Sequence, residues 1–570
     1  MDNVLSRFER VWVLDFEFQQ QPGDVPNVHC LVARCFRSGQ TIRQWVTDNP
    51  TPFRFGPNDL LVAYFASAEI GCLLSLGWGL PRFVLDLYCE WRVGTNGLSV
   101  GRGLLDAAIV HGLGAMESSE KTTMRDLAIR GGPFTDDEKR ALVAYCEQDV
   151  ITTSRLLERM LPTIDLDRAL LRGEYMSSVA KMERTGVPID VETLDRLKQR
   201  WGDIVQHLVG RVDTNGEVYE GSTFKTEKFC KYLVQHDIAW PRLESGKLEL
   251  TDDCFRQMAR RYPKQIARFH ELRHTLGQMR LCALPVLGGR NRTMLSPFAT
   301  KTGRNAPSTS RGIFGPSTWL RSLIRPEPGR AVAYVDWKQQ EFGIAGALSQ
   351  DLNMLAAYES GDPYLAFAVQ SGSVPPTATK ATHGAQRALF KICVLAVGYG
   401  QTEFGLAHAI GKSPVYAKEL LQLHRRTYPK FYQWSQRAID NAILAGEIQS
   451  VFGWKMKVGS DTKPRTLQNF PAQANGAEMM RIASVLLQRA GIAVCCPVHD
   501  AFLVEGPSVE IDDVVTATRE CMRRASEIVL DGFGLDTDAE VIRYPERYSD
   551  ERGETMWKAI SELVGDPAPC

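Results

Sequence analysis

The fold of this chain is decided by the stretch Val332-Ala-Tyr-Val-Asp336-Trp-Lys-Gln339-Gln-Glu341-Phe-Gly-Ile344. Its first half is an apolar, β-branched run after the turn Pro326-Glu-Pro-Gly329, which predicts a β-strand. Asp336 stands at the end of this strand, and a helix-compatible segment follows it. A strand end can hold a carboxylate in a cleft, where it binds a divalent cation. On this stretch alone, an aspartate in solvent is the simpler interpretation.

A second stretch of the sequence favours the metal-binding interpretation of Asp336. Residues 492–505 read as two apolar β segments with the polar pair His499-Asp500 at the bend between them, which predicts a hairpin. Such a hairpin can place Asp500 beside Asp336. Two carboxylates on strand ends suit a pair of Mg²⁺ ions about 3.5 to 4 Å apart, as used for phosphoryl or nucleotidyl transfer. The pairing of these two residues is a hypothesis from spacing.

Three motifs in this part of the chain resemble those of family A DNA polymerases, the polymerase I type. Asp336-x-x-Gln339-x-Glu341 resembles the first palm motif, Val498-His499-Asp500 resembles the last, and Arg387-Ala-Leu-Phe-Lys391-Ile-Cys-Val-Leu395-Ala-Val-Gly-Tyr399-Gly400 resembles the fingers motif. The resemblance implies an α+β right-hand polymerase domain over residues 166–570. Its expected parts are a thumb at about 190–289, a palm at 290–350 and 460–570, and fingers at 351–459.

The fingers motif has a physical interpretation of its own. Arg387, Lys391, Leu395 and Tyr399 are four residues apart, so on a helix they form one stripe with cations first and apolar groups last. The resemblance assigns Arg387 and Lys391 to the nucleotide's phosphates and makes Lys391 the proton donor to pyrophosphate. It places Tyr399 at the template-base pocket. Leu395 stands where the family has Phe or Tyr, so sugar discrimination should differ.

The palm motifs match the family in part. Asp336 and Asp500 are the two metal-binding, catalytic carboxylates that the resemblance implies, while Gln339, Glu341 and His499 match substrate-binding positions, and Glu341 would exclude a ribose 2′-hydroxyl. The chain departs from the family at two further positions. Gly343 stands where the family has an arginine, which puts a template-side contact in doubt. Ala501 stands where the family has a supporting glutamate, and alanine cannot bind a cation.

Basic and amide residues indicate a DNA-binding surface. Residues 290–330 carry eight Lys or Arg and one acid, Glu327, in a loop-rich interval, which suits phosphate binding. Thr302-Gly303-Arg304 resembles a family motif that reaches the primer-template. The segment from Arg465 to Gly476 resembles Arg-x-x-x-Asn-x-x-x-Gln-Gly with Asn475 inserted, and such groups can donate to minor-groove acceptors. The expected DNA contacts are Arg304, Arg321, Arg465, Asn469 and Gln473.

The N-terminal residues resemble a different catalytic fold. Asp15 and Glu17 lie on one face of the strand predicted from Val11, and Tyr145 and Asp149 share one side of a later helix. This set resembles the 3′-to-5′ proofreading exonuclease, an α/β ribonuclease H-like domain expected at residues 1–165. In that family the acids hold two metals and the tyrosine positions the attacking water.

The remaining exonuclease carboxylate is a departure from the family. The middle motif usually has an aspartate preceded by an asparagine, whereas this chain offers Glu69 preceded by Phe65. Glu69 is therefore the expected fourth metal ligand, with Asp86 as an alternative. A degenerate exonuclease fold that serves only as a platform is the competing interpretation.

Composition limits the other possibilities. The chain has 570 residues, 44% hydrophobic and 24% charged, so several globular domains are expected. No apolar run reaches the roughly 18 residues of a membrane span, and no signal-peptide core is present, so we expect a cytoplasmic protein without membrane partners. The net charge is zero, so DNA binding must depend on local patches. The 13 cysteines form no C-x-x-C pair and are expected to be reduced.

The sequence as a whole predicts a template-directed DNA polymerase with a proofreading exonuclease. Expected cofactors are two Mg²⁺ per active site, with Mn²⁺ as a substitute, and expected partners are primer-template DNA, dNTPs and replication accessory proteins. No 5′-nuclease domain fits ahead of Val11, which suggests a compact, phage-like enzyme of a bacterial or phage-infected cell, associated with the nucleoid. Three alternatives remain open: a single-subunit RNA polymerase, a reverse transcriptase, and an exonuclease or nucleic-acid-binding protein with an impaired polymerase site.

Overall fold

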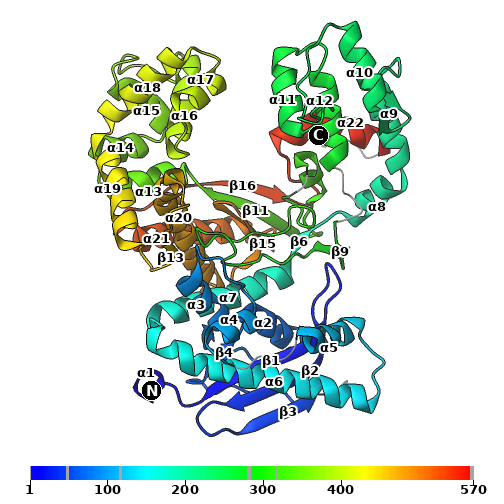
Figure 1. The fold of residues 1–570 in the computed structure, drawn as a ribbon, viewed down its shortest axis with the longest axis vertical. Coiled ribbons are helices and arrows are strands. Elements are labelled where there is room, and N and C mark those ends of the chain that lie inside the picture. The colour runs from blue at the N-terminus through cyan, green and yellow to red at the C-terminus, as the bar shows by residue number, and fades with distance from the viewer. Residues whose placement is uncertain (1, 47–49, 114–117, 279–283, 316, 565–570) are drawn as a thin grey trace. The chain divides into compact units, whose positions relative to one another are not determined.

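The computed structural model describes residues 2–46, 50–113, 118–278, 284–315 and 317–564 (Figure 1). Their packing forms two compact units. Unit 1 comprises Met1–Thr185, Leu295–Ala306 and Ala333–Val541, and unit 2 comprises Gly186–Met294, Pro307–Val332 and Ile542–Cys570. In the described part of the chain, no helix is both long and apolar enough to cross a membrane.

The N-terminal part of unit 1 contains a five-stranded sheet in the order β3-β2-β1-β4-β5. The central strand β1 pairs antiparallel with β2 and parallel with β4, and its first four residues are buried. Asp15 and Glu17 lie in its second half and are half-buried, on one face as predicted. The strands are β1 (Val11–Gln19), β2 (Asn27–Cys35), β3 (Thr41–Trp45), β4 (Leu60–Ala63) and β5 (Phe83–Asp86).

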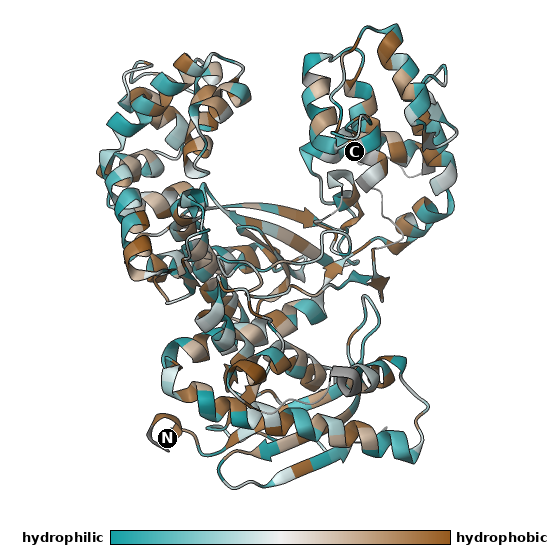
Figure 2. Cartoon of the chain, in the orientation of Figure 1, coloured by the Kyte–Doolittle hydropathy of each residue, from teal (hydrophilic) through white to brown (hydrophobic). Residues whose placement is uncertain are grey.

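Helices cover this sheet, and the longest of them is α6 (Asp136–Met160), which packs against β1 and β2. It begins with a capping box, because the Thr135 hydroxyl accepts a hydrogen bond from Glu138 N and Glu138 accepts one from Thr135 N. Figure 2 shows hydrophilic and hydrophobic residues alternating along α6, as expected of a helix with one face on a core. The others are α1 (Asp2–Leu5), α2 (Ala66–Ser75), α3 (Leu87–Thr95), α4 (Leu104–Val110), α5 (Ser118–Arg130) and α7 (Leu166–Thr185).

Helix α7 joins the two halves of unit 1. It contacts α2 and β5 on the N-terminal side, and β14 (Ala493–Val498) and α20 (Pro464–Arg489) on the C-terminal side. Arg172 of α7 forms a buried, bidentate ion pair with Glu90 of α3, at 2.7 and 2.8 Å. A buried charge is tolerated when paired in this way. The predicted domain boundary at residue 165 therefore falls just before a helix that both halves share.

The C-terminal part of unit 1 contains a four-stranded sheet in the order β14-β15-β11-β16. Its remaining strands are β11 (Arg330–Trp337), β15 (Ala501–Pro507) and β16 (Thr537–Arg543). The predicted hairpin is present, with Val498 paired to Ala501 around His499 and Asp500. Trp337 is buried beneath the sheet and donates to Met522 O, 3.2 Å away, on α21 (Ile511–Val529).

A helical region follows β11 in sequence and lies in the upper left of Figure 1. It ends with the short strands β12 (Glu447–Gln449) and β13 (Lys455–Lys457). This region coincides with residues 351–459, the segment predicted to form the fingers, except that its first helix falls within residues 290–350, which were predicted as palm. Its helices are α13 (Gln340–Ser349), α14 (Leu352–Glu359), α15 (Pro363–Gln370), α16 (Gly384–Gly398), α17 (Glu403–Ile410), α18 (Pro414–Thr427) and α19 (Pro429–Ala445).

Unit 2 is mainly helical, as predicted for residues 190–289. Phe229, Phe255 and Trp240 form an aromatic core, with ring centroids 4.9 to 5.4 Å apart. A small sheet in the order β6-β10-β9 is built from β6 (Val187–Pro188), β9 (Val286–Leu287) and β10 (Arg290–Asn291). The helices are α8 (Val191–Gln199), α9 (Trp201–Val212), α10 (Thr226–Gln235), α11 (Asp252–Arg261), α12 (Ala267–Gln278) and α22 (Glu551–Val564).

Replacing either of two helical glycines with alanine should change the stability of the protein, in opposite directions. A Cβ at Gly173 in α7 would lie 1.9 Å from Val84 O, a backbone atom, whereas a Cβ at Gly210 in α9 would meet nothing within 4 Å. Gly173→Ala should therefore lower the free energy of unfolding by about 2 to 4 kcal/mol, as overpacking does. Gly210→Ala should raise it by about 0.5 to 1 kcal/mol. Thermal and urea unfolding of both variants will measure this, and a neutral Gly173→Ala would show that α7 does not approach β5 this closely.

Candidate active site

The C-terminal sheet brings the two predicted catalytic aspartates together. Asp336 lies at the end of β11 and Asp500 at the tip of the β14–β15 hairpin, and Trp337 N donates to Asp500 O at 3.2 Å. Burial, then the charges of Asp500 and Asp538, raise the pKa of Asp336 to about 6. Burial also raises the pKa of Asp500. Carboxylates that repel each other in a half-buried site are stabilised by a bound cation.

Backbone strain marks both strand ends. Gln339 has φ +41° directly after β11, and His499 has φ +54° in the hairpin. Positive φ is unfavourable for residues with a Cβ, and such residues concentrate at functional sites. The strained backbone turns the chain sharply beside each aspartate.

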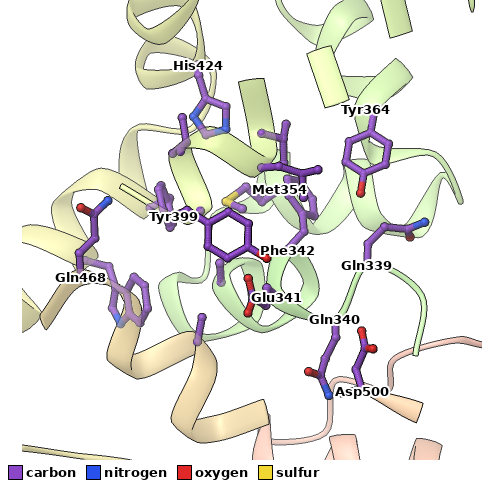
Figure 3. A pocket seen from close by; sticks show the side chains of 18 of the residues that line it. Gln339, Gln340, Glu341, Phe342, Met354, Tyr364, Tyr399, His424, Gln468 and Asp500 are labelled. Carbon is purple, nitrogen blue, oxygen red and sulfur yellow. The ribbon is translucent and has the colours of Figure 1, made fainter. Parts of the chain in front are cut away.

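A cavity of about 490 Å³ adjoins this pair and is lined by Asp500, His499, Gln339, Glu341 and residues of α16. Figure 3 shows the Tyr399 ring in the middle of the cavity, with Glu341 below it. The negative charge of Glu341 is the main cause of a raised Tyr399 pKa, which confirms that the two groups are near each other. Leu395 also lines the cavity and is 41% exposed.

The stripe on α16 is present as predicted, and the structure adds partners that the sequence did not reveal. Arg387 forms an ion pair with Asp362, the N-cap of α15. The ring of Tyr364 lies beneath both cations, 5.5 Å from the Arg387 guanidinium carbon and 5.7 Å from Lys391 Nζ. Tyr364 also lines the cavity. No sequence motif pointed to Asp362 or Tyr364, because only the pairing of α15 with α16 brings them to the stripe.

The predicted DNA-contact residues have different environments. Arg304 forms an ion pair with Glu341 at 3.2 Å and lines the cavity. Arg465 donates to Tyr399 O at the end of α16. Arg321 belongs to unit 2, where it is 13% exposed and donates to Asp550 at 2.7 Å.

The amide residues of α20 divide into two groups. Asn469 and Gln473 are half-exposed, and Asn469 Oδ1 is buried without a hydrogen-bond partner among the described residues. Asn475 is buried instead, donating to Pro471 O at 2.8 Å and accepting from Val451 N at 2.9 Å. Asn475 is thus a structural residue that supports a helix containing a proline.

The structure shows the surroundings of two residues that depart from the family pattern, Gly343 and Ala501. A Cβ at Gly343 would lie 2.5 Å from the Leu535 side chain and 3.0 Å from the Tyr358 ring, so a longer side chain has no room there without movement. Ala501 is fully buried in β15. A second acid on the same strand, Glu505, lies further along β15 and is 7% exposed.

A second acidic cluster lies in the N-terminal sheet. Ligand atoms of Asp15, Glu17 and Cys146 are all within 4.8 Å of one another. Tyr145 on α6 donates a hydrogen bond to Asp149, and its pKa is raised by burial and then by the charges of Asp149, Glu17 and Asp15. Four of the five residues predicted for the exonuclease, Asp15, Glu17, Tyr145 and Asp149, are therefore near one another.

Glu69 completes this cluster. It is 4% exposed, and burial followed by the charges of Asp15 and Glu17 raises its pKa well above the usual range. Its Oε2 atom has no hydrogen-bond partner in the part of the chain that the structure describes. The alternative residue, Asp86, caps α3 and accepts from Cys89 N and Ala66 N at 2.8 and 2.6 Å. The donor set and the unpaired Glu69 oxygen fit hard divalent cations.

The comparisons with known proteins agree with the polymerase part of these observations. Residues 261–541, just under half of the chain, match the sequence model of DNA polymerase family A. DNA polymerase I of Chloroflexus aurantiacus is 26% identical over 83% of this chain and 53% of its own length. The DNA polymerase of Mycobacterium phage L5 is 25% identical over 70% of this chain and 66% of its own length. This chain thus spans about half to two thirds of the length of these two curated relatives.

A solved structure has the same fold. It is described as the POL domain of Pol1 from M. smegmatis in complex with DNA primer-template and dNTP, and it matches 95% of this chain with a TM-score of 0.71 at 18% identity. This match confirms the predicted right-hand polymerase fold. The region 261–541 carries the sequence pattern of family A.

The raised pKa of Asp336 predicts a pH-dependent gain in stability on neutralisation. Above about pH 6 the wild-type protein must ionise this half-buried carboxyl, whereas in the unfolded chain it ionises near pH 4. Asp336→Asn should therefore raise the free energy of unfolding by about 1 kcal/mol at pH 7.5, after allowance for solvent screening, and by nothing below about pH 4. Thermal unfolding across pH 4 to 8 without divalent ions will test this. The exposed Asp137→Asn serves as control, and a gain that does not change with pH would contradict the prediction.

Proposed function

We propose that this chain, whose residues 261–541 match family A, is a DNA-directed DNA polymerase that extends a primer with dNTPs and also proofreads it. One observation carries the proposal. Asp336 and Asp500 come from distant parts of the sequence and meet beside a cavity that is lined by Leu395 and Tyr399 of the α16 stripe. The two cations of the stripe, Arg387 and Lys391, lie over the ring of Tyr364, which also lines this cavity. Acids together with nearby cations suit a metal-bound triphosphate.

The residues around the cavity have separable roles in this proposal. Asp336 and Asp500 would hold two Mg²⁺ ions, which activate the primer 3′-hydroxyl and stabilise the charge on the phosphates. Arg387 and Lys391 bind the triphosphate, and Lys391 gives a proton to the leaving pyrophosphate. Glu341 closes the cavity beneath Tyr399 and leaves no room for a ribose 2′-hydroxyl.

The primer-template would use Arg304, Arg465, Asn469 and Gln473. Arg304 and Arg465 have protein partners in this structure, Glu341 and Tyr399 O, so DNA must compete with these contacts. Asn469 and Gln473 are half-exposed residues of α20, and their side-chain NH₂ groups would donate to the minor-groove edge of a base pair. Contacts of this kind check the shape of the pair without reading the sequence.

The N-terminal cluster supports a 3′-to-5′ exonuclease. Asp15, Glu17, Glu69 and Asp149 would bind two divalent cations, which activate water and stabilise the leaving 3′-oxygen. Tyr145 would orient the attacking water through its hydroxyl, which donates to Asp149 in this structure. The single observation behind this part is the crowding of Glu69 against Asp15 and Glu17.

A second function is favoured by one observation, the buried Ala501 in place of the family's glutamate. An exonuclease or DNA-binding protein with an impaired polymerase site would bind a primer-template but not extend it in Mg²⁺ or Mn²⁺. A third possibility, an unusual sugar or template preference, follows from Leu395 and would appear in extension assays with rNTPs or an RNA template.

Two variants should separate the two activities. Asp500→Asn should lower primer extension by at least roughly a thousandfold, because it removes one of two metal ligands, while shortening of the primer without dNTPs continues. Asp15→Asn should have the reverse effect. Both are measured on one 5′-labelled primer-template, with Asp137→Asn as control. If the wild type never extends the primer in Mg²⁺ or Mn²⁺, the polymerase proposal is wrong.

Glu69 provides an independent test of the exonuclease site. Glu69→Gln should raise the melting temperature of the metal-free protein at pH 7.5, because on folding the wild type must either bury the charge of this carboxyl beside two others or take up a proton to neutralise it. It should also reduce the additional stabilisation that Mg²⁺ provides and slow primer shortening by roughly tenfold or more. Asp86→Asn should instead destabilise the protein, since each carboxylate oxygen of Asp86 accepts a backbone N–H and an amide would turn a donor toward one of them. A Glu69→Gln variant with unchanged metal response would exclude Glu69 as a ligand.

A further inference from the structure

Lys338 is a cation next to the catalytic strand that no motif explains. It directly follows β11, in which Val335 and Trp337 are buried while Tyr334 and Asp336 are half-exposed. Lys338 is half-exposed as well, so it lies on the same open face as Asp336. Positions two apart on a strand are separated by about 6.5 Å, which a lysine side chain easily spans.

The neighbouring strand supplies its partner. Lys338 N donates to Asp536 O and Tyr544 N donates to Arg330 O, so β11 and β16 run antiparallel with Asp538 opposite Asp336. Lys338 Nζ lies 3.0 Å from Asp538 Oδ1. The pKa of Asp336 is consistent with this placement, because the charge of Asp538 contributes to raising it and the charge of Lys338 to lowering it. Asp336, Lys338 and Asp538 therefore share one patch of the sheet.

Hydrogen bonds hold the backbone of Lys338, whereas only an exposed ion pair holds its side chain. Tyr358 Oη donates to Lys338 O at 3.1 Å and accepts from Asp536 N at 3.0 Å, so it ties the backbones of Lys338 and Asp536 together. The ion pair is open to solvent, since the side chains of Lys338 and Asp538 are 31% and 68% exposed. Pairs this exposed contribute little to stability, so a more highly charged partner can displace Asp538.

We propose that Lys338 is a further phosphate-binding residue of the polymerase site and that Asp538 holds it in place until a nucleotide binds. The inference rests on the proposed polymerase function, in which metal ions bound by Asp336 bring the triphosphate to this patch. Arg387 and Lys391 then approach the phosphates from α16, and Lys338 approaches from the sheet. The Arg387–Asp362 pair is a second example in which a phosphate-binding cation is held by an aspartate in the nucleotide-free protein.

Two variants should have different effects on nucleotide binding. Lys338→Met removes the charge but keeps the length, and should weaken dNTP binding by roughly five- to tenfold. Asp538→Asn frees the lysine, and should leave dNTP binding unchanged or strengthen it by roughly twofold. The measured quantity is the dissociation constant of the correct dNTP for full-length enzyme bound to a dideoxy-terminated primer-template in Mg²⁺, where no chemistry can occur. The effect of Lys338→Met should disappear when a nucleoside without phosphates is used as the probe.

The controls separate this inference from its alternatives. Lys139 and Asp136 form a similar exposed pair on α6, and Lys139→Met and Asp136→Asn should leave dNTP binding unchanged. If Asp538→Asn weakens dNTP binding as much as Lys338→Met does, Asp538 acts as a metal ligand or the pair is structural, and the proposal is wrong. If the wild type binds and incorporates dNTPs but Lys338→Met binds them normally, only the role of Lys338 fails. If the wild type does neither, the polymerase function itself fails.

Discussion

The repulsion between carboxylates held close together is the constraint on which both sites depend. Asp336 faces Asp500, and Glu69 faces Asp15 and Glu17, in settings where burial already disfavours charge. Only a proton or a bound cation relieves this repulsion. The fold holds the acids in place regardless, because they project from strands and helices that are fixed by buried packing, such as β11 over Trp337. Crowded acids on rigid elements are the arrangement that a preorganised metal site requires.

Three cations that we propose to bind phosphate or DNA are each paired with an acid. Arg304, Arg387 and Lys338 pair with Glu341, Asp362 and Asp538, respectively. These ion pairs limit the rotamers of the three cations, so less conformational freedom would be lost when a phosphate replaces the carboxylate. Because each pair is at least partly exposed, such an exchange would cost little.

The sequence predicted those parts of the sites that depend on local pattern. A strand ending in Asp336, a hairpin with Asp500 at its tip, and a stripe four residues apart on α16 are all set by periods of two or four residues. Asp362, Tyr364 and Asp538 were not predicted, because they reach the site only through the pairing of α15 with α16 and of β16 with β11. Asn475, the residue inserted into the resembling motif, is buried against Pro471 and Val451, and only the packing of α20 reveals this structural role.

The segment Leu535–Asp538 shapes the surroundings of Asp336. Leu535 lies against Gly343, Asp536 accepts a hydrogen bond from Lys338 N, and Asp538 pairs with Lys338 opposite Asp336. Tyr358 contacts the same segment through its hydroxyl and lies close to Gly343 through its ring. A side chain at residue 343 would first meet the end of the Leu535 side chain, which can rotate, and then the Tyr358 ring. The effect of a substitution at Gly343 therefore depends on how Leu535 and Tyr358 adjust, and it cannot be inferred from a family pattern alone.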